Sequence, residues 1–278
     1  MHPYLFEILG RKVASYGVLM VVGAVAAWFY VRGLSSKANK DIPLVFLVAI
    51  CGGLIGAFLL RPIMKLPVAL LHWEQYGQMT VDGFLSYLFG EIVFYGGLVG
   101  GAVGVLLYCG AYKLPIPSVT DVFAPALALG HGIGRIGCFF AGCCYGVAVD
   151  ASHPFAVVYP PSSLLAPPGI PLLATPLIES ACLFALAAIL GLAYTKVKLI
   201  GLSTALYFVL YAPMRFMLEF FRGDGIRGIY GSFSTSQYIS MLLFAVGAVL
   251  LCLMLSKQRR AAGGHALCNP EHTDDGGN

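Results

Sequence analysis

Seven long apolar stretches run along this chain of 278 residues, and they constrain its fold more than any other feature. A helix needs about 20 mostly apolar residues to cross the hydrocarbon core of a bilayer. Stretches of suitable length and composition lie at residues 13–31, 43–60, 92–112, 122–141, 177–195, 201–219 and 236–256. In lipid the backbone must satisfy its own polar groups, so each stretch is expected to be helical. The sequence therefore predicts an all-α integral membrane protein with seven transmembrane helices.

The composition agrees with this class. Hydrophobic residues make up 59% of the chain and charged residues 11%, whereas soluble globular proteins have about 45–50% and about 25%. The formal net charge of +4 is small and spread over the loops, so a nucleic-acid surface is not expected. The partner that the composition does predict is the bilayer.

Basic residues near the segment ends predict the orientation. The first, third, fifth and seventh segments are followed by Arg32, Lys113, Lys196 and Arg259, among other basic residues. Ends that carry Lys and Arg are retained in the cytoplasm. The amino terminus is therefore expected outside and the carboxyl terminus inside.

The remaining segments complete the expected organisation. Residues 1–256 are expected to form one membrane domain. Its external loops are 61–91, which holds interfacial aromatic residues such as Trp73, and 147–176, which holds seven prolines. The first loop is expected along the membrane surface and the second as an ordered loop or lid. Residues 257–278 are polar and Gly-rich, and are expected to form a disordered cytoplasmic tail.

Arg135 is the most unusual residue of the fourth segment. A guanidinium at the edge of hydrocarbon is costly unless an anion or strong acceptor meets it. It could be a snorkelling arginine at the outer interface or part of an anion site. The neighbouring Gly134 and Gly137 favour the anion site, because glycines expose backbone N–H groups and permit a tight turn. His131, one turn earlier, is expected to be a structural donor.

The sixth segment carries Tyr211, Arg215, Glu219 and Arg222 at spacings of four, four and three. These spacings place all four residues on one helical stripe. One interpretation is a pair of intrahelical bridges through Glu219. The favoured interpretation is a phosphate site, because one carboxylate cannot saturate two guanidinium groups. Arg135 and Arg215 would then clamp one phosphodiester.

Further polar residues lie in the outer halves of the segments. Tyr16 and Tyr95 fit either an interfacial belt or hydrogen-bond donors of the site. Gly96 and Gly97 begin a glycine-rich run that is typical of helix packing in membranes. Glu179, an acid near the start of the fifth segment, requires a basic partner, and an arginine of the site is the candidate.

Cys138, Cys143 and Cys144 form the only cluster among the eight cysteines. Four interpretations remain open for them: a metal site, a disulfide between Cys138 and either of the others, a reactive thiolate assisted by Arg135, and apolar packing. The spacings differ from the two-residue gap of zinc sites, and no fourth ligand stands near in the sequence. No metal site is therefore predicted.

These residues, in this order, resemble the prolipoprotein diacylglyceryl transferase family over about residues 10–255. The most specific parts of the likeness are Gly134–Gly146 and the run Arg215-x-x-x-Glu219-Phe-Phe-Arg222. The resemblance implies a seven-helix bundle in the bacterial inner membrane, with an external head region and a site facing the periplasm. It also implies transfer of the diacylglyceryl group of phosphatidylglycerol to a lipobox cysteine of prolipoproteins, with glycerol 1-phosphate released and no metal or redox cofactor.

The resemblance also implies roles for individual residues. Arg135 and Arg215 would hold the lipid phosphate and stabilise the leaving group. Tyr16 and Tyr95 would hydrogen-bond to the head group or the thiol. The remaining residues expected to bind substrate or orient the arginines are Gly134, Gly137, Glu179, Tyr211, Glu219, Arg222, Gly96 and Gly97.

The chain departs from the family at six positions, of which Ala174 and Pro176 replace the Pro and Gln of a Pro-Thr-Gln motif. Many members carry Arg in place of Leu54, His in place of Tyr95, Asn in place of Cys138 and Glu in place of Cys143. A potential base and a carboxylate are thereby missing, which bears on the acceptor half of the reaction. The alternatives are a paralogous lipid transferase for another thiol or hydroxyl acceptor, and a non-enzymatic lipid-binding membrane protein.

Overall fold

The structure is a computed structural model that describes residues 3–8, 11–35, 40–90, 93–197, 199–224 and 228–266. Within this part, long helices occupy all seven predicted segments: α1 (Ser15–Leu34), α2 (Ile42–Leu71), α5 (Phe94–Ala111), α6 (Ile116–Ala141), α7 (Thr175–Lys196), α8 (Leu202–Phe220) and α9 (Thr235–Ala266). Two short helices, α3 (Trp73–Tyr76) and α4 (Val81–Phe89), lie between α2 and α5. The apolar pattern therefore located the helices correctly.

Five of these helices are long and apolar enough to cross a membrane: α1, α2, α6, α7 and the Thr235–Ser256 part of α9. Helix α5 is apolar but shorter than these five helices. Helix α8 is less apolar, because it carries the charged residues Arg215 and Glu219. Only 11% of the most apolar window of α9 is buried inside the protein. An apolar helix with so much exposed surface requires lipid around it, which supports a multi-pass membrane protein.

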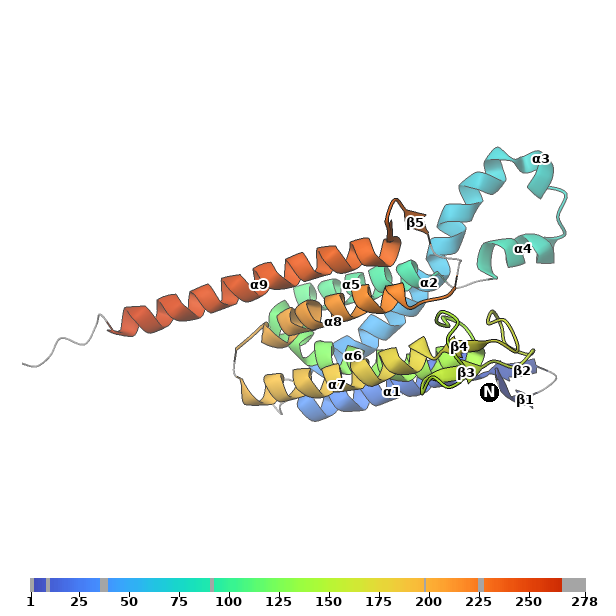
Figure 1. Ribbon diagram of the computed structural model, residues 1–278. Helices are drawn as coiled ribbons and strands as arrows, with labels where there is room; N and C mark the ends of the chain where they lie inside the picture. The colour runs from blue at the N-terminus through green and yellow to red at the C-terminus, as the bar shows by residue number, and fades with distance from the viewer. Residues whose placement is uncertain are drawn as a thin grey trace, which may run out of the picture.

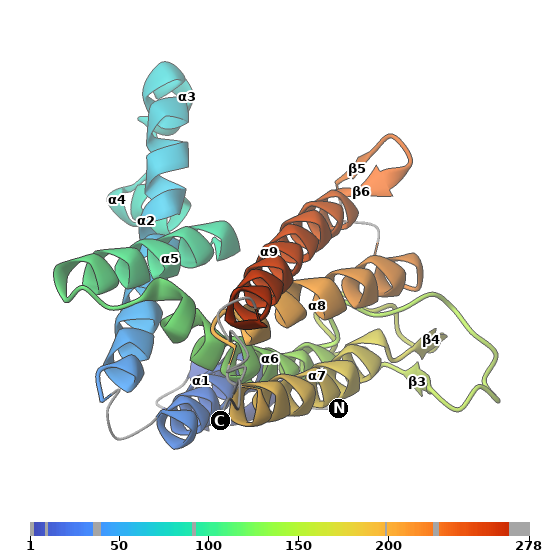
Figure 2. The same ribbon diagram turned by 90° about the vertical axis from the view of Figure 1, so that its left-hand side faces the viewer.

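The long helices lie roughly side by side (Figure 1). Helices α2 and α5 pack together at one side, α8 and α9 at the other, and α1, α6 and α7 lie between them (Figure 2). Helix α6 contacts α1, α7 and α8, and is the most buried of the five apolar helices. A charged side chain on α6 can therefore find partners on several helices.

Glycines allow the close approach of α2 and α5. A β-carbon added at Gly56 would lie 2.9 Å from the Cα of Gly100 and would collide with the carbonyl oxygen of Gly96. A β-carbon at Gly96 would collide with the carbonyl oxygen of Gly56 in the same way, whereas one at Gly97 would lie 3.4 Å from the carbonyl oxygen of Gly53. These contacts are those of a helix-packing motif.

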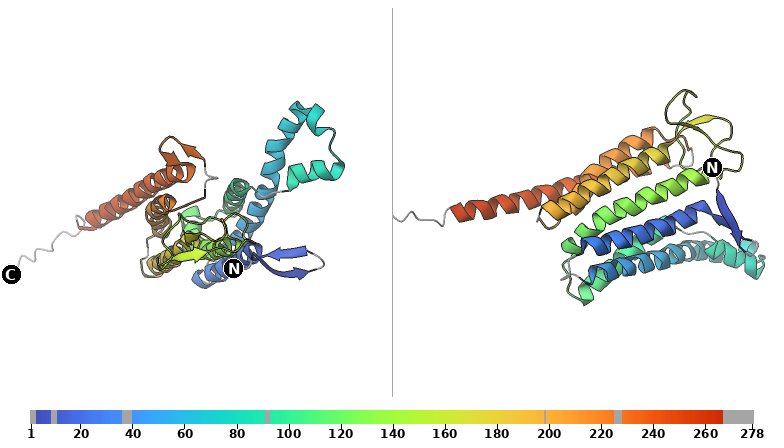
Figure 3. Two further views of the ribbon diagram at one scale, coloured as in Figure 1. Left: turned by 45° about the vertical axis from the view of Figure 1, so that its right-hand side comes forward. Right: turned by 90° about the horizontal axis from the view of Figure 1, so that it is seen from below.

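In the described part of the chain, three two-stranded antiparallel sheets lie at one end of the helices, together with α3 and α4 (Figures 1 and 3). They are β1 (Tyr4–Ile8) with β2 (Arg11–Ala14), β3 (Ala156–Val158) with β4 (Pro171–Leu173), and β5 (Ile229–Tyr230) with β6 (Phe233–Ser234). We refer to this end as the head end. The all-α prediction is therefore wrong in detail, because the connecting segments satisfy their backbone groups by pairing with one another.

The connections differ in part from their predicted form. Helix α2 continues through Pro62 and Pro67, so the start of the predicted 61–91 loop is helical. Each proline removes one backbone hydrogen bond, which a long apolar helix tolerates. The 147–176 loop packs around the buried Tyr159 and is ordered by the β3–β4 pairing.

The last helix also differs from its predicted end. Helix α9 runs on past Ser256 to Ala266, so the beginning of the predicted tail is helical. The rest of that tail, 267–278, lies outside the described residues.

Asp121 lies inside α6 and not at its start. The fourth segment was expected to begin near this residue, but α6 begins at Ile116 and Asp121 is buried within it. Its carboxylate accepts hydrogen bonds from the backbone N–H of Gly201, and from the backbone N–H and hydroxyl of Thr204 at 2.9 Å each. Asp121 therefore caps the amino terminus of α8.

Candidate functional site

Helices α6 and α7 bring Arg135 and Glu179 together. The NH2 of Arg135 lies 3.0 Å from Oε1 of Glu179, and its Nε donates a hydrogen bond of 3.2 Å to Nε2 of His131. Only 14% of the Arg135 side chain is exposed, and Glu179 is buried. Glu179 thus pairs with an arginine, as its sequence position suggested. His131 acts as an acceptor rather than the expected donor, one helical turn before Arg135.

Helix α8 supplies a second buried pair. The NH1 of Arg215 lies 2.6 Å from Oε2 of Glu219, one turn later on the same helix, and both side chains are buried. This is one of the intrahelical bridges considered from the sequence. A buried ion pair on a helix of a membrane bundle marks an internal polar region.

Arg222 follows α8 and forms a bidentate pair. Its Nε and NH2 donate to Oδ1 and Oδ2 of Asp224 at 3.0 Å and 2.6 Å. Burial lowers the pKa of Arg222, but the hydrogen bond to Asp224 and the surrounding negative charges together hold the pKa above its ordinary value. Asp224 is not among the residues predicted from the sequence. The Arg-Gly-Asp spacing was visible, but the pairing depends on a turn in which Arg222 bridges to Gly146.

Tyr211 connects the two arginine pairs. Its ring centroid lies 5.9 Å from that of His131, and it stacks on Tyr207. Tyr211 lies within electrostatic reach of Arg135, Arg215 and Glu179. Three helices therefore converge on one buried polar region, which we refer to as the arginine site and which comprises Arg135, Glu179, His131, Arg215, Glu219 and Tyr211.

The predicted glycine turn around Arg135 is wrong. Gly134 and Gly137 are helical and allow α1 to approach α6. A β-carbon at Gly137 would lie 3.3 Å from the Cα of Tyr16, and one at Gly134 would lie 3.1 Å from the sulfur of Met20. These glycines thereby bring Tyr16, which is 41% exposed, within electrostatic reach of Arg135.

The remaining predicted residues lie elsewhere. Gly96 and Gly97 pack against α2, and Tyr95 is 54% exposed at the start of α5, on the head end. Leu54 is exposed on α2. The α2–α5 pair lies on the other side of α6 from α8 (Figure 2), so these residues belong to a different part of the head end.

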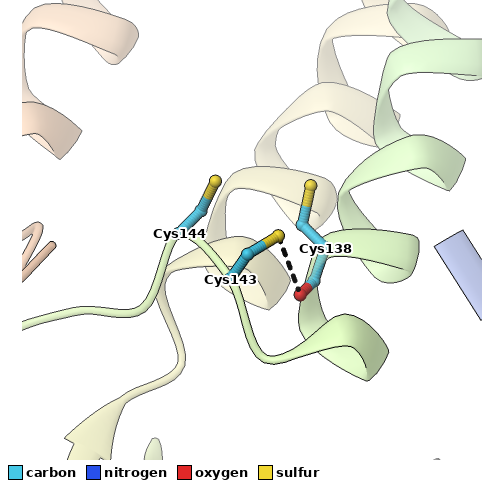
Figure 4. Close-up of side chains that lie close together, drawn as sticks. All are labelled: Cys138, Cys143 and Cys144. Carbon is cyan, nitrogen blue, oxygen red and sulfur yellow. Dashed lines mark hydrogen bonds between the residues drawn. The ribbon is translucent and has the colours of Figure 1, made fainter. Parts of the chain in front are cut away.

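The three clustered cysteines meet where α6 ends. Gly142 caps the helix in the left-handed conformation, with φ of 68°, and Cys144 follows with φ of 58°. The three Sγ atoms lie within 4.8 Å of one another, and the Cys143 thiol donates to the Cys138 carbonyl oxygen at 3.5 Å (Figure 4). All three thiols are free. The sequence already grouped these cysteines, and the turn after α6 folds the last two back over the first.

The thiols of this cluster influence one another. Hydrogen bonds from the Cys138 and Cys143 thiols hold the pKa of Cys144 below its ordinary value, although burial opposes this. The positive charges of Arg222 and Arg135 act in the same direction. The hydrogen bonds between the thiols raise the pKa of Cys143 correspondingly. The positive charges of Arg222 and Arg135 thus favour a thiolate in this turn.

Together these features define a class: a multi-pass helical membrane protein with buried arginine–carboxylate pairs near its head end. The family model for prolipoprotein diacylglyceryl transferase matches residues 3–253, which is nearly the whole chain. The chain belongs to this family.

Similar proteins cover almost the full length. Phosphatidylglycerol–prolipoprotein diacylglyceryl transferase 2 of Clostridium perfringens is 34% identical over 266 residues, which are 95% of this chain and 99% of that protein. The transferase of Clostridium tetani is 34% identical over 250 residues, covering 89% and 95%. The transferase of Rickettsia rickettsii is 27% identical over 259 residues, covering 91% and 96%.

Proposed function

We propose that this protein transfers the sn-1,2-diacylglyceryl group of phosphatidylglycerol to the sulfur of the lipobox cysteine of prolipoproteins. A carbon–sulfur bond forms, and the carbon–oxygen bond to the phosphate breaks. Glycerol 1-phosphate leaves, and the thiol proton passes to the leaving group or to solvent. Family membership and the named activity of relatives that match nearly the full chain support this reaction.

The observation that carries the proposal is the arginine site. A guanidinium has five N–H donors, and the described contacts of Arg135 use its Nε and one terminal nitrogen. The other terminal nitrogen is then a donor for a lipid phosphate. Glu179 and Glu219 orient the two guanidinium groups, and these stabilise the charge that develops on the departing phosphate.

The tyrosines are assigned to the substrates. Tyr16 packs on α6 beside Arg135, where its hydroxyl can donate to the head group or assist the incoming thiol. Tyr95 is exposed at the head end of α5, which suits contact with the acceptor peptide more than with the buried phosphate.

The orientation is part of the proposal. Seven crossings would place the head end outside and the opposite end in the cytoplasm of a bacterial inner membrane. Arg32, Lys113 and Lys196 support this, since they lie at or beyond the ends of α1, α5 and α7 that are remote from the head end. The arginine site, near the head end, would then face the periplasmic leaflet. Residues 1–256 would form the membrane domain, and the polar residues after them would lie in the cytoplasm.

The test is a transfer assay with purified protein, phosphatidylglycerol vesicles and a lipobox peptide. We expect diacylglyceryl-peptide and glycerol 1-phosphate in equal amounts. Arg135→Gln and Arg215→Gln should each lower the rate by about 10²–10³-fold, as expected when a donor to a developing oxyanion is removed. Lys196→Gln, an exposed cation at the opposite end, is the matched control and should retain activity.

Two results would contradict the proposal. Full activity in well-folded Arg135→Gln and Arg215→Gln variants would remove the role of the arginine site. Absence of product with the lipobox peptide, but transfer to another thiol or hydroxyl acceptor, would assign the protein to a different lipid transfer.

A further inference from the structure

We propose that Cys138, Cys143 and Cys144 form a binding site for a soft, thiophilic metal ion with a filled d shell, Cu(I) or Zn(II). Their sulfur atoms converge from the last turn of α6 and the residues directly after it (Figure 4). In the described part of the chain, no further Cys, His, Asp or Glu joins this group. The inference concerns ion binding alone and does not depend on the transfer reaction.

The distances suit a shared ion. All three Sγ atoms lie within 4.8 Å of one another without an ion between them. Thiolates bound to one such ion lie about 2.3 Å from it, and hence about 4 Å from one another. The sulfur atoms therefore need to approach by less than about 1 Å, which side-chain rotation can supply.

The turn that carries the cysteines is already held in place. The backbone N–H of Cys143 donates to the Cys138 carbonyl at 3.1 Å, and that of Ala166 donates to the Gly142 carbonyl at 2.9 Å. The hydroxyl of Thr175 donates to the Cys144 carbonyl at 3.3 Å. Cys144 is held in a left-handed conformation that residues other than glycine rarely adopt. A site that is ordered beforehand loses little conformational freedom when an ion binds.

The ligand set selects the class of ion. The side-chain ligands that the described residues bring to this cluster are three sulfur atoms, which favour soft ions over magnesium, calcium or manganese. A disulfide would use only two of the three sulfur atoms and leave one over, whereas an ion engages all three.

The nearby charges favour the monovalent ion. Three thiolates and Cu(I) carry a net charge of −2, and Arg135 and Arg222 both act electrostatically on Cys144. Their positive charges favour the more negative complex, and each guanidinium is at the same time paired with a carboxylate, Glu179 or Asp224. Zn(II) would require a fourth ligand, such as water, to complete its tetrahedral coordination.

The experiment is a metal titration of the purified, reduced, metal-free protein in detergent under anaerobic conditions. Cu(I) is titrated in competition with bicinchoninate, and Zn(II) in parallel against a colorimetric zinc reporter. We expect one equivalent of Cu(I) or Zn(II) to bind, and binding to be lost when all three cysteines become serine. Cys51→Ser, an exposed cysteine on α2, is the control and should bind as the unchanged protein does.

Two further measurements distinguish loss of the metal site from misfolding of a variant. X-ray absorption on the unchanged protein should show three sulfur atoms at about 2.3 Å from the ion. The single variant Cys143→Ser, at a half-buried position, should bind more weakly while keeping the thermal unfolding midpoint of the metal-free protein.

Three outcomes would overturn the proposal. These are failure of both ions to bind with one-to-one stoichiometry, equal binding by the triple serine variant, and a first coordination shell without sulfur. A disulfide between Cys138 and either neighbour that persists in protein purified without reductant would also overturn it, because oxidised sulfur is not a thiolate ligand.

Discussion

Arg135 shows how a charge is accommodated inside an apolar bundle. Its guanidinium meets a carboxylate on α7 and an imidazole one turn earlier on α6. A buried ion pair adds little net stability, but removal of one partner leaves an uncompensated charge. The pair therefore serves the arrangement of the site more than the stability of the fold, and its partners are as important as the arginine.

Glu179→Gln should destabilise the protein by about 3–5 kcal/mol, because Arg135 then remains buried without its carboxylate. The double variant Glu179→Gln with Arg135→Gln should recover part of this loss, since neither charge is then buried. Thermal or denaturant unfolding in detergent measures both effects. Glu7→Gln, an exposed glutamate in β1, is the control, and equal stability of Glu179→Gln and Glu7→Gln would contradict the expectation.

Residue types alone indicated much of the arginine site. Arg135, Arg215 and Glu179 stood out because charges inside apolar segments need partners. The identity of those partners was harder to predict: Asp224 lay outside the segments, and His131 was expected as a donor. The Arg135–Glu179 pair depends on how α6 packs against α7, and the Arg222–Asp224 pair depends on a turn, so neither is encoded in local spacing. The His131–Arg135 contact follows the i, i+4 spacing of one helix, and only its direction differs from the expectation.

Helix α6 is the element that organises the bundle. Its head end supplies Arg135 and the cysteine turn, and its opposite half supplies Asp121, which caps α8. The carboxylate satisfies backbone N–H groups that a helix start leaves without intrahelical partners. One helix therefore sets both the position of α8 and the site that α8 shares.

Asp121→Ala should lower the free energy of unfolding by about 1–3 kcal/mol, because buried donors at the start of α8 lose their acceptor. Unfolding in detergent measures this loss. Asp41→Ala is the matched control: Asp41 precedes α2, and its side chain makes no capping bond. A similar effect of both substitutions would show that the α8 cap contributes nothing specific.

Gly56→Ala should destabilise the α2–α5 contact by about 1–3 kcal/mol, because the added methyl group meets the backbone of α5. Gly110→Ala, on the same pair but with nothing within 4 Å of the added carbon, should be nearly neutral. The two unfolding midpoints are compared under identical conditions. Equal midpoints would mean that the helices separate without cost at Gly56.

The molecule as a whole is polarised along its helices. The sheets, α3 and α4 lie at the head end, and the last turns of α1, α5 and α7 and the first turns of α2, α6 and α8 lie at the other (Figure 1). The arginine site and the cysteine turn belong to the head-end halves of their helices. A lipid-modifying site near one end of a bundle can take substrate from one leaflet only. The orientation in the membrane therefore decides which leaflet supplies the lipid.

Reporter fusions test this orientation. A phosphatase that is active only outside the cytoplasm should be active when fused after Gly169, in the loop between β3 and β4. A fluorescent protein that folds only in the cytoplasm should fluoresce when fused after Lys113, between α5 and α6. The physical reason for this expected orientation is that helix ends rich in Lys and Arg stay in the cytoplasm. The reverse pattern would place the arginine site on the cytoplasmic side.

The sequence by itself determined the membrane class and the positions of the long helices. It also identified the charged residues that an apolar segment cannot bury without a partner. These follow from local composition, because hydrophobic length and unpaired charge act on each segment separately. Only the tertiary structure decided that Glu179 pairs with Arg135, that Asp121 caps α8, that the small sheets form, and that the three thiols converge. Such contacts join residues on different elements or across a turn, and their geometry depends on how the whole bundle packs.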